Sequence, residues 1–248
     1  MRTIPWDQAE PGHVEVDLVH HGGPSPIGDF VDTLQLVALA TGWSERVAIL
    51  RPEGTRSQWR MEQGFRRVLA RLPFPVKELH SDHGSEFLND HLVRFFGEAI
   101  TSLQLSRSRP YQKNDNRFVE QKNSTLVRAY LGTARLDTAA QALALNALSD
   151  QMWGYYNLFQ PVMYLKEKVA TGTRVTRRWD TAKTPFARLV ATAVLSPERL
   201  VAALEAQLTQ TNPRVLRQTI YGGLRELLQG EPPREMLDWA ALHTRGGE

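Results

Sequence analysis

The chain contains no cysteine, and it also lacks any long apolar run. Without a thiol, the protein has no disulfide scaffold, no thiolate zinc site and no cysteine nucleophile. No segment approaches the roughly 18 consecutive apolar residues of a membrane span, and the amino-terminal MRTIPWDQAEPG lacks the apolar stretch of a signal peptide. We therefore expect a cytoplasmic protein that has no membrane partner.

A strong charge imbalance is missing as well, since the formal net charge is +3 over 248 residues. The isoelectric point is nevertheless about 9.3, and the basic residues are unevenly distributed. This distribution allows an acidic partner such as nucleic acid without requiring one.

Hydrophobic periodicity predicts the order of secondary structure. Residues 14–21, 30–40 and 43–50 read as strands joined by short turns, which indicates an antiparallel meander. Beyond the meander the pattern alternates between the two types: helix 57–72, strand 76–81, helix 86–99, strand 101–108, a helix from Arg117 and a helix at 138–158. In the first of these helices we expect Trp59 to share the buried face with Phe65. The order predicts an α/β fold with a five-stranded mixed sheet and flanking helices.

The same patterns divide the chain into three parts. Residues 1–13 form a lead-in, residues 14–160 a core, and residues 161–248 a small extension that is basic and mainly helical. Within the extension, residues 174–185 (RVTRRWDTAKTP) are basic and irregular, and two short helices follow them.

The segment HSDHGSEFLND at residues 80–90 concentrates potential metal ligands. One interpretation is a zinc site formed by His80, Asp82 and His83. However, only three candidates lie close together, and no helical HExxH pair occurs in the chain. The other interpretation is that Asp82, at the end of a predicted strand, belongs to a site assembled from distant segments.

Two more carboxylates have comparable settings. Asp17 lies on the polar phase of the first predicted strand, and Glu120 lies near the start of a helix that follows a polar loop. A lone carboxylate is often only a solvated charge or a helix cap. The interest of these three residues lies in their sequence contexts taken together.

Those contexts are VEVDLV, HSDHGSEFLN and SRPYQKNDNRFVEQKN. They resemble the three catalytic motifs of DDE transposases in the retroviral-integrase superfamily, with bacterial insertion-sequence transposases closest in pattern, over about residues 14–190. Asp17, Asp82 and Glu120 match the catalytic carboxylates of that family. The resemblance implies an RNase H-like fold and a polynucleotidyl transferase that cuts and joins DNA. It also implies two Mg²⁺ or Mn²⁺ ions held by these three residues, and convergent carboxylates do need cations to offset their repulsion.

Basic and polar residues after the fifth predicted strand indicate where DNA lies, because cations bind phosphates and tyrosine stacks on bases. The predicted contacts in this stretch are Arg107, Arg109, Tyr111, Lys113, Asn114, Asn116, Arg117, Lys122 and Asn123. A second basic cluster around Trp179 adds Arg174, Arg177 and Arg178. For both clusters the alternative is a solvated charged surface.

Two departures from the family pattern affect the functional interpretation. His83 stands where the family commonly has asparagine, and a histidine can replace the amide as a donor to phosphate or can be incidental. We include His83 among the candidate DNA contacts. The family also usually carries a helix-turn-helix region before its core, whereas only 13 residues precede the first motif strand here. We therefore expect weak sequence specificity, with a separate domain or subunit recognising the ends of the element.

The sequence thus predicts a DNA transposase or integrase that is associated with the bacterial nucleoid. Its expected partners are double-stranded DNA, as element ends and as target, and further copies of itself, since joining two ends requires at least two active sites in related enzymes. Two alternatives stay open: a catalytically silent DNA-binding remnant of a transposase, and a simple divalent-metal nuclease that cuts DNA without joining it.

Overall fold

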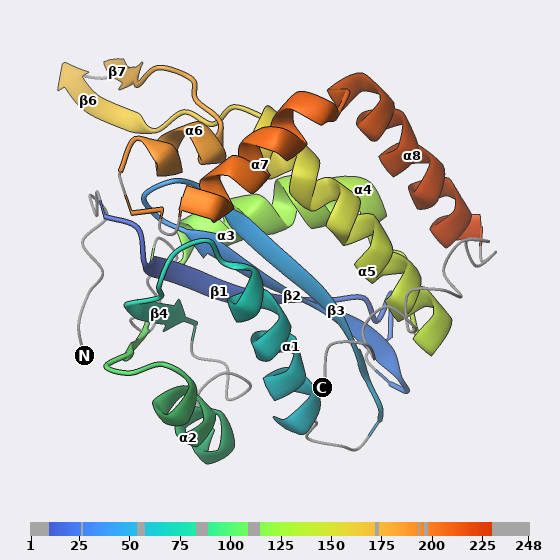
Figure 1. Cartoon of the computed structure of the whole chain (residues 1–248). Coiled ribbons are helices and arrows are strands. Elements are labelled where there is room, and N and C mark those ends of the chain that lie inside the picture. Colours follow the sequence, from blue (N-terminus) through green and yellow to red (C-terminus); the bar gives the residue numbers. More distant parts are fainter. Residues whose placement is uncertain are drawn as a thin grey trace.

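The computed structural model of the chain describes residues 10–25, 27–53, 58–82, 89–108, 115–171, 174–192, 194–195 and 198–229. At its centre is a five-stranded sheet, which consists of β1 (His13–His20), β2 (Phe30–Ala38), β3 (Ser44–Arg51), β4 (Glu78–Ser81) and β5 (Gln104–Arg107). The strand order is β3-β2-β1-β4-β5 (Figure 1). β1, β2 and β3 pair antiparallel, whereas β4 is parallel to β1 and β5 is parallel to β4. This is the RNase H-like arrangement, and the predicted fold class is confirmed.

The two faces of the sheet are covered by different helices (Figure 1). On one face lie α1 (Gln58–Arg71) and α2 (Asp90–Ala99), whose Phe65 and Phe96 rings pack edge to face with centroids 4.8 Å apart. The opposite face carries four helical segments, which are α3 (Arg117–Lys122), η1 (Asn123–Arg128), α4 (Ala129–Leu131) and α5 (Ala139–Gly154). Of these, η1 is a π-helical stretch that continues α3 directly into α4.

Side chains of β1 alternate between the two faces. Val14 and Val16 join the core with α1 and α2, whereas Glu15 and Asp17 contact α3 and η1 on the opposite face. We call this opposite face of the sheet the site face. The polar phase of β1 is therefore not open to water: Glu15 is fully buried, and Asp17 is partly buried.

The local sequence explains where the long helices begin and which sides they bury. Asn89 caps α2 by accepting from Leu92 N, and Thr138 begins α5 with a reciprocal pair of hydrogen bonds to Gln141. In α1 the side chain of Trp59 is 65% exposed, so the prediction that it shares the buried face with Phe65 is wrong. Six residues turn an α-helix by about 240° beyond one full revolution, which places the two side chains on different sides.

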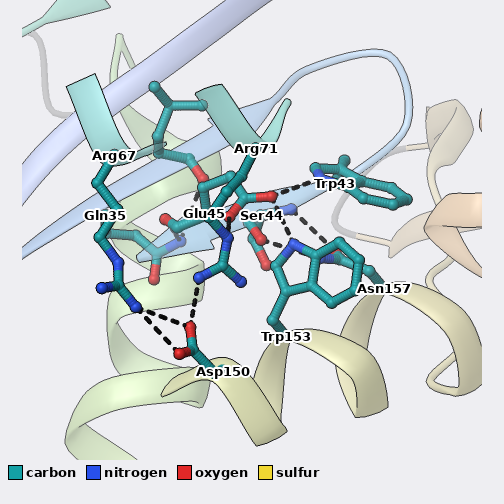
Figure 2. A network of polar contacts seen from close by, with 10 residues as sticks. Gln35, Trp43, Ser44, Glu45, Arg67, Arg71, Asp150, Trp153 and Asn157 are labelled. Atoms are coloured by element: carbon teal, nitrogen blue, oxygen red, sulfur yellow. Dashed lines mark hydrogen bonds and ion pairs between the residues drawn. The ribbon is translucent and has the colours of Figure 1, made fainter. Parts of the chain in front are cut away.

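β3 is an edge strand of the sheet, and side-chain amides occupy its outer edge. Asn157, in η2 (Tyr155–Phe159), accepts from Ser44 N and donates to Ser44 O, each at 3.0 Å (Figure 2). Asn146 of α5 makes the same pair of bonds with Ala48, at 2.8 and 3.0 Å. Unpaired backbone groups on an edge strand invite pairing with other chains, and these two amides remove part of that edge.

Glu45, which is fully buried near the start of β3, connects three elements (Figure 2). Its Oε1 accepts from the indole nitrogens of Trp43 at 3.0 Å and Trp153 at 2.5 Å, and its Oε2 pairs with Arg71 at 3.1 Å. Arg71 also pairs with Asp150 of α5. Burial raises the pKa of Glu45 to about 7, against the opposing charge of Arg71. The network holds α1 and α5, which lie on opposite faces, against the same edge of the sheet.

The C-terminal region begins with an antiparallel hairpin of β6 (Leu165–Thr171) and β7 (Arg174–Trp179). The prediction that residues 174–185 are irregular is therefore wrong for 174–179, because this stretch pairs with β6. Three helices follow, and they are α6 (Pro185–Val190), α7 (Glu198–Gln210) and α8 (Pro213–Gln229). The two predicted C-terminal helices are confirmed as α7 and α8, and α8 packs on α5. Within the described ranges, no helix is both long enough and apolar enough to cross a membrane.

Candidate active site

Asp17 lies on β1, near the middle of the sheet, and its carboxylate is held on both sides. Oδ2 accepts from Asn123 Nδ2 at 2.7 Å, and Oδ1 accepts from Leu18 N at 2.9 Å. Burial raises the pKa of Asp17 to about 6, and the negative charges of Asp82 and Glu120 act in the same direction. The hydrogen bond from Leu18 opposes this rise. Asp17 is thus an acidic group whose surroundings disfavour its own charge.

The structure brings the other two predicted carboxylates toward Asp17 from separate segments. Asp82 directly follows β4, which runs parallel to β1 with Ser81 opposite Val16, and Glu120 lies exposed in the first turn of α3. The charges of both act on Asp17. Within the described residues, however, no three His, Asp or Glu side chains stand close enough together to hold a metal ion.

Glu15 is a fourth acidic residue of this region, and it is not among the residues predicted from the sequence. Its Oε2 accepts from Val119 N, in the first turn of α3, at 2.8 Å. Burial raises the pKa of Glu15 to about 8; hydrogen bonds from the start of α3 oppose the rise, and Glu120 adds to it. Glu15 therefore connects the strand of Asp17 to the helix of Glu120. Because Glu15 lies two residues before Asp17, the alternation of a strand already places both on one face.

His80 lies in β4 and is buried among polar neighbours on the site face. Its Nδ1 is 2.9 Å from Ser106 Oγ, and its Nε2 is 3.2 Å from Ser108 Oγ. Burial lowers the pKa of His80. Both ring nitrogens are thus engaged with the strand β5 and the residue that follows it. These contacts link β4 to β5 and to Ser108, and of the other two residues in the zinc interpretation, His83 lies outside the described residues.

Lys122, a predicted DNA contact, lies near another cation. Burial, with the positive charge of Arg46 as the second cause, lowers the pKa of Lys122 to about 8. Arg46 itself is buried on β3, donates from Nη1 to Leu126 O at 3.2 Å, and has its pKa lowered to about 10 by burial. The Lys122 side chain is partly exposed.

The other predicted DNA contacts are spread over several elements. Asn123 is engaged by Asp17, and Asn116 is buried at the N-cap position of α3. Arg117 is exposed, with its guanidinium 4.9 Å from the centroid of the Phe118 ring, and Arg107 ends β5. The remaining residues on described elements belong to β7 and are Arg174, Arg177 and Arg178. Five predicted contacts lie outside the described residues: His83, Arg109, Tyr111, Lys113 and Asn114.

The sequence of the chain is similar to that of a curated protein. No family model matches the chain. The chain is 39% identical over 183 residues to the uncharacterized protein y4rM of Sinorhizobium fredii (strain NBRC 101917 / NGR234). The match covers 74% of this chain and 51% of y4rM, so the chain spans about half the length of that relative.

Solved structures with a similar chain trace include two retroviral proteins. One is the catalytic core domain of BIV integrase, with a TM-score of 0.44 and 16% identity over 73% of this chain and 95% of that chain. The other is a simian T-cell lymphotropic virus intasome in complex with PP2A regulatory subunit B56 gamma, with a TM-score of 0.44 and 13% identity over 71% of this chain and 69% of that chain. At this level of likeness, the function proposed below rests on the residues of this chain.

Proposed function

We propose that the chain is the catalytic core of a DNA transposase or integrase of the retroviral-integrase superfamily, acting as a polynucleotidyl transferase. The observation that carries this proposal is the placement of the three predicted carboxylates: Asp17 lies on β1, Asp82 directly follows the neighbouring strand β4, and Glu120 lies in the first turn of α3. The charges of Asp82 and Glu120 add to the rise that burial causes in the pKa of Asp17. The three residues come from β1, the end of β4 and α3, in the segments whose sequences resemble the family motifs. A carboxylate whose pKa is raised by burial and by the charges of neighbouring carboxylates is typical of a functional site.

The donor set fits Mg²⁺ or Mn²⁺, and we expect two ions held by Asp17, Asp82 and Glu120. All three donors are carboxylates, the hard oxygen ligands that these ions prefer. Each oxygen of Asp17 accepts one hydrogen bond, which leaves it a further lone pair for a metal. A bound cation offsets the mutual repulsion of the three charges. When bound, a pair of such ions activates the attacking oxygen and stabilises the leaving oxygen of a phosphodiester.

Two side chains of the site face position these carboxylates. Asn123 donates to Oδ2 of Asp17 and so fixes the orientation of that carboxylate. Glu15 accepts from Val119 N and so sets the place of the first turn of α3, which carries Glu120. Both interactions join β1 to the α3–η1 helix that packs on it. Together the two hydrogen bonds fix the position of Asp17 relative to the turn of α3 that carries Glu120.

The proposed substrate is double-stranded DNA, as element ends and as target, bound by exposed basic residues of the β6–β7 hairpin and by Arg117 at the start of α3. We further propose that the chain acts as a homo-oligomer on DNA in the bacterial nucleoid, with a separate domain or subunit that recognises the ends. Joining two ends needs two active sites, and one chain carries one set of the three carboxylates.

Nicking of supercoiled plasmid tests the proposal. Purified protein is incubated with the plasmid in Mn²⁺, Mg²⁺, Zn²⁺ or EDTA, beside Asp82→Asn and the matched control Asp90→Asn. Asp90 lies exposed in the first turn of α2, on the far face of the sheet. We expect nicking in Mn²⁺ or Mg²⁺ that is lost with Asp82→Asn and kept with Asp90→Asn.

The products then separate the related functions. Joined strands after addition of a labelled DNA end support a transposase or integrase, whereas nicks without joined strands indicate a simple metal-dependent nuclease. DNA binding without nicking in any metal indicates a silent remnant and contradicts the proposal. Equal nicking by wild type and Asp82→Asn also contradicts it, because Asp82 then has no part in the chemistry.

A further inference from the structure

The β6–β7 hairpin extends away from the body of the protein (Figure 1). Its apolar side chains are exposed: Val169 by 45%, Val175 by 42% and Trp179 by 53%. A two-stranded hairpin that packs on nothing is at best marginally stable in water. A surface of this kind therefore indicates a partner that covers it.

The register of the hairpin gives its two faces different charges. On one face Lys168 stands directly opposite Arg177, and Trp179 lies two residues along β7 from Arg177 on the same side. We call this the basic face. On the other face Glu167 stands opposite Arg178, and the two form an ion pair at 3.5 Å. Directly opposed like charges destabilise a strand pair, and neither Lys168 nor Arg177 has an acidic partner in the part of the chain that the structure describes. The basic face thus favours a polyanion.

The base of the hairpin is anchored beside the candidate active site. Tyr164 N donates to Asp180 Oδ1 at 2.7 Å, and Asp180 N donates to Tyr164 O at 2.9 Å, which closes the two strands. Arg188 of α6 pairs with Asp180 at 2.7 Å. The Tyr164 ring packs against Phe118 of α3, with centroids 6.0 Å apart, two residues before Glu120. The base of the hairpin therefore packs against the helix that carries the third carboxylate.

We propose that the β6–β7 hairpin is a DNA-binding ribbon that contacts duplex DNA through its basic face, with Lys168 and Arg177 on phosphates and Trp179 alongside them. A two-stranded ribbon fits the major groove of B-form DNA. The proposal rests on the proposed function in taking DNA as the partner, and it goes beyond the sequence prediction, which treats Arg177 and Arg178 alike. The two arginines are neighbours on β7 but point to opposite faces, so they form a matched pair for a test.

Salt dependence gives the expected size of the effect. Each phosphate contact adds about 0.9 to the slope of log affinity against log salt concentration. Loss of one contact therefore lowers the slope by about 1. Between about 50 and 200 mM salt the affinity advantage of the wild type over such a variant shrinks by about threefold for one contact and about tenfold for two.

The experiment measures binding of the full chain to a short labelled duplex by fluorescence anisotropy in EDTA over this salt range. We compare Arg177→Gln, Lys168→Gln and their combination with Arg178→Gln, which removes the same charge from the other face. The expected result is a salt slope that becomes less steep by about 1 for Arg177→Gln and by about 1 for Lys168→Gln. The double variant loses about 2 from the slope, and Arg178→Gln loses much less. All three side chains lie on the projecting hairpin, and circular dichroism checks that each of the four variants keeps its fold.

Equal slopes for Arg177→Gln and Arg178→Gln overturn the proposal, because the basic face then has no special part. A lowered sedimentation coefficient of Arg177→Gln, with DNA binding unchanged, also overturns it and assigns the hairpin to contact between copies of the chain. Wild-type nicking is measured separately. Nicking with no difference between the two arginines leaves the proposed function standing without this inference, and the expected slopes without nicking leave the ribbon standing without the proposed catalysis.

Discussion

Substitution of Asp17 by Asn removes a charge that the folded protein disfavours, so we expect Asp17→Asn to stabilise the metal-free protein. The amide still accepts from Leu18 N. The Asn123 side chain can rotate so that its Oδ1, which has no hydrogen-bond partner, accepts from the new amide. The substitution therefore changes the charge more than the packing. It also removes the group on which Asp82 and Glu120 act.

The magnitude follows from the pKa of Asp17, which rises from 3.8 to about 6 on folding. At about 1.4 kcal/mol for each pKa unit, the ionised side chain lowers the free energy of unfolding by at most ~3 kcal/mol. Asp17 is only partly buried, so solvent screening reduces this to about 1–2 kcal/mol. The folded protein holds this proton to higher pH than the unfolded chain does. The protein therefore has the full stability of the protonated side chain below about pH 4, and it loses this stability as the pH rises toward about 6.

The assay compares the two proteins rather than following one. Other buried groups titrate over the same range: burial lowers the pKa of His21 to about 4 and raises the pKa of Glu45 to about 7 and that of Glu15 to about 8, so the pH dependence of the wild type alone does not report on Asp17. These groups are present in both proteins, so their contributions cancel in the difference. Urea unfolding in EDTA, followed by tryptophan fluorescence, gives the free energy of unfolding at pH 4, 5, 6 and 7. We expect the advantage of Asp17→Asn to be near zero at pH 4 and to reach about 1–2 kcal/mol at pH 7.

A difference that stays constant from pH 4 to pH 7 refutes this reasoning, because Asp17 then titrates alike in the folded and unfolded states. The matched control is Asp90→Asn, which removes an exposed carboxylate from the first turn of α2, on the opposite face of the sheet from Asp17. Excess Mn²⁺ reverses the order, since it binds the wild type and stabilises it.

Two further predictions concern the support of the site. Glu15→Leu leaves Val119 N–H without its acceptor and lowers the free energy of unfolding by about 1–3 kcal/mol, whereas Glu15→Gln keeps an acceptor and stays near the wild type. Urea unfolding and hydrogen exchange at Val119 measure both, and equal behaviour of the two variants contradicts the link. Asn146→Ala removes two hydrogen bonds to Ala48 and costs about 2 kcal/mol in the same assay. It also exposes the edge of β3, so light scattering near the unfolding midpoint rises, and unchanged scattering contradicts the protective role.

The central strands were predictable because their period and turns are local signals. The expected strand 14–21 is observed at His13–His20, and the expected helix 57–72 is observed at Gln58–Arg71. The β6–β7 hairpin was missed for a physical reason. Both of its faces are exposed and charged, so neither strand shows the alternation that marks a strand resting on a core. Only the pairing of the two strands reveals it.

The candidate site also combines residues that the sequence predicts with contacts that only the tertiary structure reveals. The three carboxylates follow from the sequence motifs, and Glu15 was within reach because a strand places i and i−2 on one face. The hydrogen-bond partners of His80 could not be predicted, because they depend on the register in which β4 pairs with β5. The hydrogen bond from Asn123 to Asp17 could not be predicted, because the position of the α3–η1 helix against β1 is a tertiary feature that no local pattern encodes.

The central claim is that Asp17, Asp82 and Glu120 form one metal site. Anomalous scattering from a crystal of the protein grown with Mn²⁺ tests it most directly, since manganese is located independently of the chain. The account predicts anomalous peaks in contact with all three carboxylates, lost in crystals of Asp82→Asn. Peaks at other acidic residues, or none at these three in excess Mn²⁺, contradict it.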